Sequence, residues 1–152
     1  MSIPLNKALE KAGNLIVTKM RDNLKQQKAN ASGKLSDSIS YTIQEGNNET
    51  SLLIGMENYG PIVDEGRGPS KGGGGTDWKP KIIAWMKAKG IRPRAGVTME
   101  TAAYLIYRKI NQKGYRPKPF IQISIDQVVD NILPNELEAD MVEWINETLR
   151  RK

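Results

Sequence analysis

The 152-residue chain contains no cysteine and no histidine, and it has only one phenylalanine. Without cysteine there are no disulfides, no thiolate nucleophiles and no sulfur-ligated metal sites. Without histidine the chain lacks the commonest general base and the commonest metal ligand. The remaining routes to catalysis are carboxylate pairs, Ser–Lys dyads and oxygen-ligated metals.

Long apolar runs are also missing. No stretch approaches the roughly 20 apolar residues that span a bilayer, and the segment from Met1 to Lys7 lacks the hydrophobic core of a signal peptide. We therefore expect that the protein does not associate with membranes, and that it is made and functions in a cytoplasm-like compartment. The length predicts a single domain over residues 1–152.

Positive charge is concentrated in the middle of the chain. The net charge is +6, and residues 66–118 carry thirteen basic side chains against only Asp77 and Glu100. Residues 119–152 carry seven acidic and three basic side chains. A basic middle beside an acidic end is compatible with contact to nucleic acid. It is equally compatible with copies of the protein that dock head to tail, so both interpretations stay open at this point.

The remaining catalytic options lack diagnostic spacing. Asp64 and Glu65 are adjacent, and adjacent side chains point in different directions on a helix or a strand. A phosphate-binding loop needs Lys-Ser/Thr after its second glycine, whereas here Lys71 precedes the glycines and Asp77 occupies the expected helix start. The sequence therefore predicts no enzyme, no cofactor and no metal.

Hydrophobic periodicity outlines the first half of the chain. Apolar residues three to four apart predict an amphipathic helix over residues 3–27. Alternating apolar residues at 39–43 and 52–56, separated by Gly46-Asn47-Asn48, predict an antiparallel hairpin. Pro61 suits the first turn of a short helix that ends at Gly66. The glycine-rich segment 66–77 predicts a flexible loop.

The second half reads as helices with one ambiguous segment. Helices are expected after Asp77, with Gly90 as the stop, after Thr98, and over residues 135–152. Apolar residues alternate over residues 120–126, which favours a strand that passes into a short helix. Helical spacing over 121–132 fits equally well, and Pro134 is expected to break whichever element precedes it. The expected fold is an α+β domain. Its antiparallel sheet of three to five strands would be packed by the N-terminal helix and by the helices after Asp77.

Three short phrases occur in a fixed order. They are Ala31-Ser32-Gly33-Lys34-Leu35-Ser36-Asp37-Ser38-Ile39, which opens a β-like stretch, Tyr59-Gly60-Pro61-Ile62-Val63-Asp64-Glu65-Gly66, and Arg116-Pro117-Lys118-Pro119-Phe120. Together they resemble the tail-completion, or head–tail joining, proteins of the tailed-bacteriophage neck. The residues that match the family phrases are Gly33, Leu35, Ser38, Tyr59, Glu65, Gly66, Pro119 and Phe120. Family members commonly have threonine where this chain has Arg67, and the segment 77–112 is a larger insertion than the simplest members show.

The resemblance implies a structural role in the virion. Such proteins assemble in the host cytoplasm as rings, with six copies or alternatively twelve, between the portal–connector stack and the tail terminator or tail tube. They join the DNA-filled head to the tail and keep the DNA channel continuous. Contact with the genomic DNA in that channel would be non-specific.

The residues expected at subunit or partner interfaces flank the glycine-rich loop and the basic segment. We expect Ile62, Val63 and Trp78 at the base of the loop, Arg67 and Lys71 reaching a neighbouring subunit, and Arg92 and Arg94 meeting a partner ring or DNA. Trp78 and Trp85 lie on one apolar helix face, which fits a buried core and a protein interface about equally well. The alternative function is a small basic protein that binds nucleic acid without sequence preference.

Overall fold

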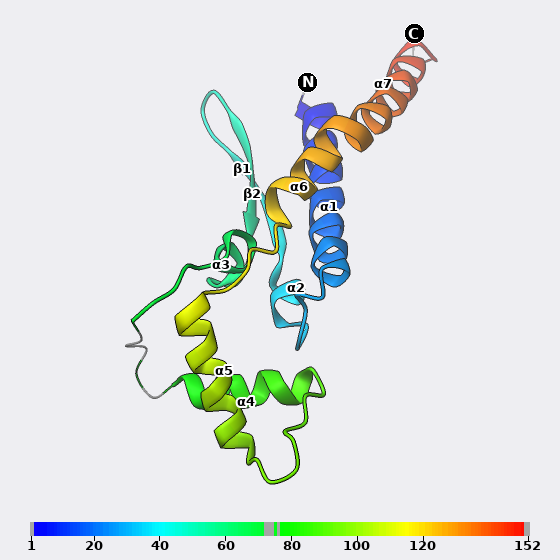
Figure 1. The fold of residues 1–152 in the computed structure, drawn as a ribbon. Helices are drawn as coiled ribbons and strands as arrows, with labels where there is room; N and C mark the ends of the chain where they lie inside the picture. The colour runs from blue at the N-terminus through cyan, green and yellow to red at the C-terminus, as the bar shows by residue number, and fades with distance from the viewer. Residues whose placement is uncertain (1, 72–74, 76, 151–152) are drawn as a thin grey trace.

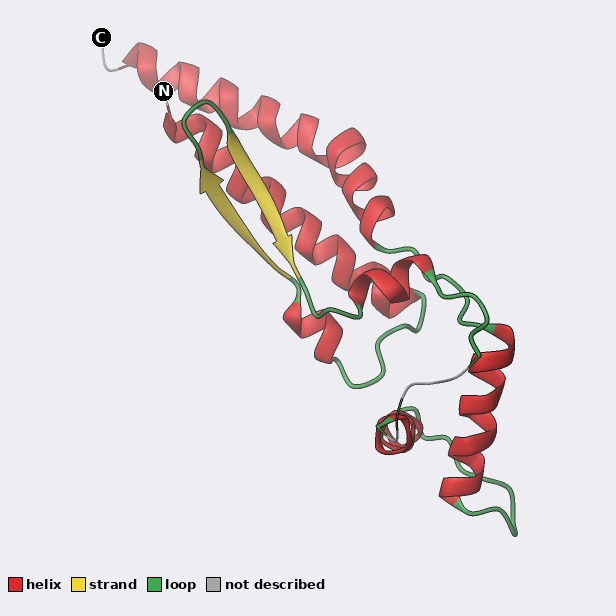
Figure 2. Ribbon diagram, turned by 90° about the vertical axis from the view of Figure 1, so that its left-hand side faces the viewer, coloured by secondary structure: helices red, strands yellow, loops and turns green. Residues whose placement is uncertain are grey.

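The computed structural model of the chain describes residues 2–71, 75 and 77–150 (Figure 1). The molecule is elongated and has two parts. One part contains the N-terminal helix α1 (Ser2–Gln26), a β-hairpin, and the C-terminal helices. The other part is the helical pair α4 (Trp78–Ala88) and α5 (Met99–Lys113), which extends away from the first part (Figure 2). Part of the expected glycine-rich loop, residues 72–74 and 76, lies outside the described residues.

The expected sheet of three to five strands is wrong. The chain is 63% helical, and the sheet among the described residues has two antiparallel strands, β1 (Ser40–Glu45) and β2 (Thr50–Gly55). The hairpin register pairs Ser40 with Gly55 and Glu45 with Thr50 around the predicted turn. The N-terminal helix packs on this hairpin as expected. By contrast, α4 and α5 pack mainly on each other and lie apart from it (Figure 1).

Two segments that the sequence suggested as extended are helical. The phrase beginning at Ala31 contains α2 (Lys34–Ser38), which starts after Gly33 in a left-handed conformation, with φ of 84°. Residues Ile121–Asp126 form α6 and not a strand. The π-helix η1 (Gln127–Ile132) and then α7 (Leu133–Arg150) follow α6 directly. Pro134 does not end the helix: it is the second residue of α7, which continues to Arg150.

The core lies where α1, α2 and the α6–η1 segment meet beneath the hairpin. Phe120, Met20, Leu24 and Val128 have no measurable exposure, and Ile39 is 1% exposed. Half-buried residues of both strands pack against this cluster. A polar contact crosses the core, where Asn23 Nδ2 donates to Ser124 Oγ at 2.8 Å. The single phenylalanine of the chain thus lies at the centre of the core.

Candidate partner-binding surfaces

The three phrases of the sequence meet at one junction below the hairpin. The helix α3 (Gly60–Glu65) belongs to the second phrase, and Asp64 Oδ1 accepts hydrogen bonds from the backbone N–H groups of Phe120 and Ile121. The carbonyl of Val63 accepts from Lys118 N at 2.9 Å. Ser38, from the first phrase, accepts from Glu57 N at 3.0 Å. These bonds fix α3 against the start of α6 and against the end of α2.

The acidic residue in this junction is not Glu65, which the resemblance to neck proteins selected. Glu65 is exposed, whereas its neighbour Asp64 is half-buried and holds the start of α6. Gly66 follows with φ of 72° and lies against the carbonyl of Tyr115. Sequence reasoning missed Asp64 because its partners are 56 and 57 residues further along the chain, beyond any local pattern.

A largely apolar cleft of about 680 Å³ separates the helical pair from the rest of the molecule. We call it the α3–α4 cleft. One wall comes from residues 29–35 and from α3, and the other from α4 and α5. The expected interface residues Ile62, Val63 and Arg67 line it. The aromatic lining residues are Tyr59, Trp85 and Tyr115.

Apolar side chains in the cleft are open to solvent although the cleft is concave. Ile62 is 52% exposed, Trp85 41% and Tyr59 39%. Trp85 is therefore not the core anchor that its helical spacing allowed. A contiguous apolar hollow of this kind marks a surface that binds something.

The other expected interface residues lie elsewhere. Trp78 stacks on Tyr107, with ring centroids 4.2 Å apart, and so belongs to the contact between α4 and α5. Arg92 and Arg94 are exposed in the loop that joins these two helices. Lys71 is exposed on the segment that leads to α4. The structure thus brings Ile62, Val63 and Arg67 together and leaves the remaining four outside the cleft.

The charges that line the cleft are positive. Its charged lining residues among those described are Lys34, Arg67 and Lys81, of which Lys34 also pairs with Glu57 at 3.5 Å. Burial raises the pKa of the Tyr59 phenol, and nearby Glu57 raises it further. Next to the cleft, Lys89 Nζ donates to the carbonyl of Lys28 at 2.7 Å and connects α4 to the end of α1.

One wall of the cleft also contains a polar atom without a partner. Asn30 Oδ1 is buried and accepts no hydrogen bond from any part of the chain that the structure describes. A buried acceptor left in this state costs about 1–3 kcal/mol.

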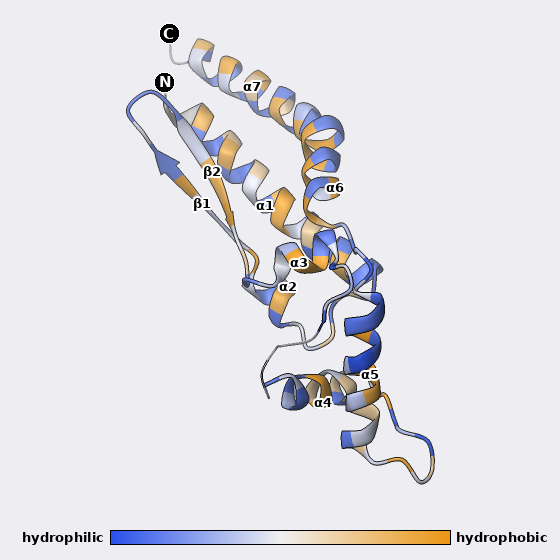
Figure 3. Cartoon of the chain, turned by 60° about the vertical axis from the view of Figure 1, so that its left-hand side comes forward, coloured by the Kyte–Doolittle hydropathy of each residue, from blue (hydrophilic) through white to orange (hydrophobic). Residues whose placement is uncertain are grey.

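The second candidate surface is the outer half of α7. Every residue from Met141 to Arg150 is exposed, and the helix continues past the N-terminal turn of α1 (Figures 1 and 3). Large apolar residues recur along it at helical spacing. We call Met141, Trp144, Ile145 and Leu149 the α7 stripe; their exposures are 60%, 48%, 44% and 65%.

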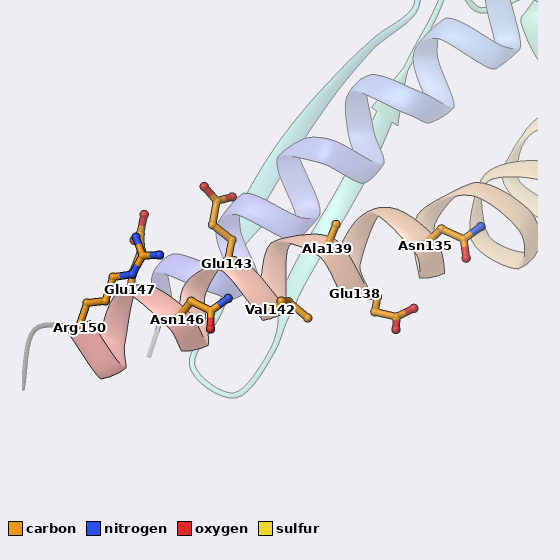
Figure 4. A pocket seen from close by; sticks show the side chains of 8 residues that line it. All are labelled: Asn135, Glu138, Ala139, Val142, Glu143, Asn146, Glu147 and Arg150. Atoms are coloured by element: carbon orange, nitrogen blue, oxygen red, sulfur yellow. The ribbon is translucent and has the colours of Figure 1, made fainter.

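A different side of α7 is mostly polar. Figure 4 shows the side chains that project from it: Asn135, Glu138, Ala139, Val142, Glu143, Asn146, Glu147 and Arg150. None of the stripe residues is among them. The inner half of α7 is attached to α1 through Lys11, whose Nζ lies 2.7 Å from Glu136 and 3.1 Å from Asp140. Hydrogen bonds to these carboxylates raise the pKa of Lys11, and the bond to Glu136 has the larger effect.

Neither surface presents chemistry for a metal. Among residues 2–71, 75 and 77–150, no group of three or more acidic side chains is placed to hold a metal ion. None of the helices in this part of the chain has the length and apolar character needed to cross a membrane.

Comparisons of the chain with protein-family models, with curated proteins and with solved structures found no match.

Proposed function

We propose that this protein is a structural component of a tailed-phage virion that forms a ring in the neck and joins the DNA-filled head to the tail. The observation that carries the proposal is that a small chain leaves two large apolar surfaces open, the α3–α4 cleft and the α7 stripe. Monomeric proteins rarely expose contiguous apolar patches of this kind. Both surfaces are suited to permanent contacts with other protein subunits.

The meeting of the three phrases supports the same proposal. The three phrases are dispersed over about ninety positions of the sequence, and hydrogen bonds made by Ser38, Asp64 and Phe120, one from each phrase, help to hold one junction together. That junction supports Ile62 and Val63 on one wall of the cleft. The phrases thus position a surface for binding and supply no reactive group.

The charge distribution supports an assembly of several copies. The cleft is lined by cations, whereas α7 carries five acidic residues and one basic residue, Arg150. Opposite charge on two separate surfaces of one chain favours association between copies, because it steers encounter and rejects like-charged contacts.

Electron microscopy of lysates from a phage or prophage that lacks this gene tests the proposal. We expect DNA-filled heads and finished tails that lie separate, and restoration of complete particles when the gene is supplied in trans. Complete, infectious particles without the gene would refute the neck function.

The exposed arginines of the α4–α5 loop favour non-specific nucleic-acid binding as a second candidate. The loop between α4 and α5, to which Arg92 and Arg94 belong, lies at an end of the molecule far from α7 (Figure 1). Binding to duplex DNA across a salt series tests it, with Arg92→Ala/Arg94→Ala as the variant. Tight, salt-dependent binding that the variant abolishes would support this function. Binding that the double variant leaves unchanged, or that does not weaken as the salt concentration rises, would count against it.

A further inference from the structure

We propose that the α7 stripe of one copy docks in the α3–α4 cleft of a second copy, head to tail. This inference rests on the proposed function for its setting, a ring of identical subunits. The observations that carry it are the amphipathic character of α7, the apolar cleft, their opposite charges and their positions in the molecule.

The α7 stripe has the form of a helix that binds in a groove. Its residues stand at positions i, i+3, i+4 and i+8 from Met141, which places them along one side of the helix. Grooves on protein surfaces recognise amphipathic helices through anchors at this spacing. The anchors include Trp144, an indole of the type enriched among the residues that dominate binding energy.

The α3–α4 cleft has the form of the receptor. It has a volume of about 680 Å³ and its lining is largely apolar. Ile62 from α3 and Trp85 from α4 are half-exposed on opposite walls. A row of helix side chains inserted between these walls would cover both of them.

The charges around the two surfaces are complementary. Arg67 and Lys81 line the cleft, and no acidic residue lines it among the described residues. On α7, Glu138 stands three residues before Met141 and Glu147 three residues after Trp144, so each is adjacent to a residue of the stripe on the helix surface. An acidic helix is therefore the occupant that this cleft favours, and the chain itself contains one.

The positions of the two surfaces exclude docking within one copy. The outer half of α7 and the helical pair that forms the cleft lie at opposite ends of the elongated molecule (Figures 1 and 2). A copy that gives its stripe to one neighbour keeps its cleft free for another. Such a heterologous contact continues from copy to copy and closes into a ring when the rotation between copies allows it.

Analytical ultracentrifugation over a concentration series of the full chain tests the contact. We expect the wild type to self-associate. Trp144→Glu in the stripe and Ile62→Glu in the cleft should each raise the dissociation constant at least about 30-fold, as expected for a lost anchor residue. Trp85→Glu, on the opposite cleft wall, should behave like Ile62→Glu. Leu53→Glu is the matched control, because Leu53 is 48% exposed on β2 and belongs to neither surface.

A mixing experiment distinguishes the contact between one stripe and one cleft from other modes of self-association. Trp144→Glu keeps an intact cleft, and Ile62→Glu keeps an intact stripe. An equimolar mixture of the two should form a one-to-one complex and nothing larger, although each variant alone is monomeric. Circular dichroism confirms that the variants fold, which their exposed positions favour.

Three results would overturn the inference. A wild type that stays monomeric over the whole series would show that the stripe does not bind a second copy and serves a different protein. Self-association by Ile62→Glu and Trp85→Glu would point to contacts between two α7 helices. A mixture of the two monomeric variants that forms no complex would exclude the head-to-tail contact.

The failure of this inference is distinguishable from failure of the neck function. If the chain does not self-associate but its deletion leaves heads and tails separate, the neck function stands and the interface is wrong. If the contact is confirmed but particles form without the gene, the interface stands and the neck function is wrong.

Discussion

The carboxylate of Asp64 lies 2.7 Å from the backbone nitrogen of Phe120 and 2.8 Å from that of Ile121. The first N–H groups of a helix have no partner within the helix, and here α3 supplies an anionic acceptor for those of α6. The bond also holds the short α3 under the core, because Phe120 is completely buried in it.

Loss of this cap should destabilise the protein. We expect Asp64→Ala to lower the free energy of unfolding by about 0.5–2 kcal/mol, the usual cost of removing a helix cap. Urea denaturation measures the change. Glu65→Ala is the matched control, because Glu65 is the adjacent acidic residue and is exposed. Equal effects of the two substitutions would contradict the assignment of the cap to Asp64.

Gly66 should not tolerate a side chain. A Cβ atom there would lie 2.6 Å from the carbonyl oxygen of Tyr115 and 2.7 Å from Pro117 N. Its backbone angles, φ 72° and ψ −175°, belong to a region that is essentially restricted to glycine and costs other residues about 1–3 kcal/mol. Gly66→Ala should therefore lower the free energy of unfolding by at least that amount.

A second glycine provides the control for this prediction. Gly68 has no heavy atom within 4 Å of the position of a Cβ. Gly68→Ala should leave thermal stability nearly unchanged, whereas Gly66→Ala should lower the Tm by several degrees, since about 1 kcal/mol corresponds to about 2–8 °C over the usual range of domain sizes. A stable Gly66→Ala protein would show that the turn relaxes freely.

Stability should fall at alkaline pH, partly because of Tyr115. Burial raises the pKa of its phenol above the ordinary value of 10.0. As the pH rises through 10, the unfolded chain loses this proton before the folded chain does, so the unfolded state is favoured. Tyr115→Phe should reduce the loss of unfolding free energy between about pH 8 and about pH 11, which brackets the titration of tyrosine. Identical alkaline slopes for both proteins would contradict this role.

Lys11 should hold the inner half of α7 to α1. Replacing it with glutamine removes both ion pairs with Glu136 and Asp140. We expect faster amide hydrogen exchange over residues 133–140 and the same trend for the wild type at high salt, because exposed pairs are screened. Lys7→Gln is the control, since Lys7 is an exposed lysine on the same helix. Unchanged exchange in Lys11→Gln would mean that apolar contacts alone hold α7.

Local patterns predicted most of the helices and the hairpin. The stripe of α1, the turn at Gly46 and the cap of α5 by Thr98, which accepts from Thr101 N at 3.2 Å, all depend on residues close in sequence. The segment after Phe120 could not be decided in this way, because its apolar spacing fits a strand and a helix. In the structure it is a helix, which packs on α1 and whose start is capped by Asp64, 56 residues away from Phe120.

The sites were only partly predictable for the same reason. Ile62, Val63 and Arg67 are close in sequence and share the cleft. Trp85 joins them only because α4 lies opposite α3, which no spacing within α4 reveals. The expectation of a larger sheet was wrong because the alternating apolar residues after Phe120 belong to the helix α6 and not to a further strand. In the structure the hairpin packs on α1 instead.

The helical pair leaves the rest of the chain and returns to it at a single point. Arg67 and Tyr115 form an isolated antiparallel bridge, in which each backbone N–H donates to the carbonyl of the other. The insertion between them therefore starts and ends at adjacent positions of the scaffold. A change in its length or sequence would alter the cleft wall that α4 and α5 supply, and with it the shape of the partner that the molecule accepts.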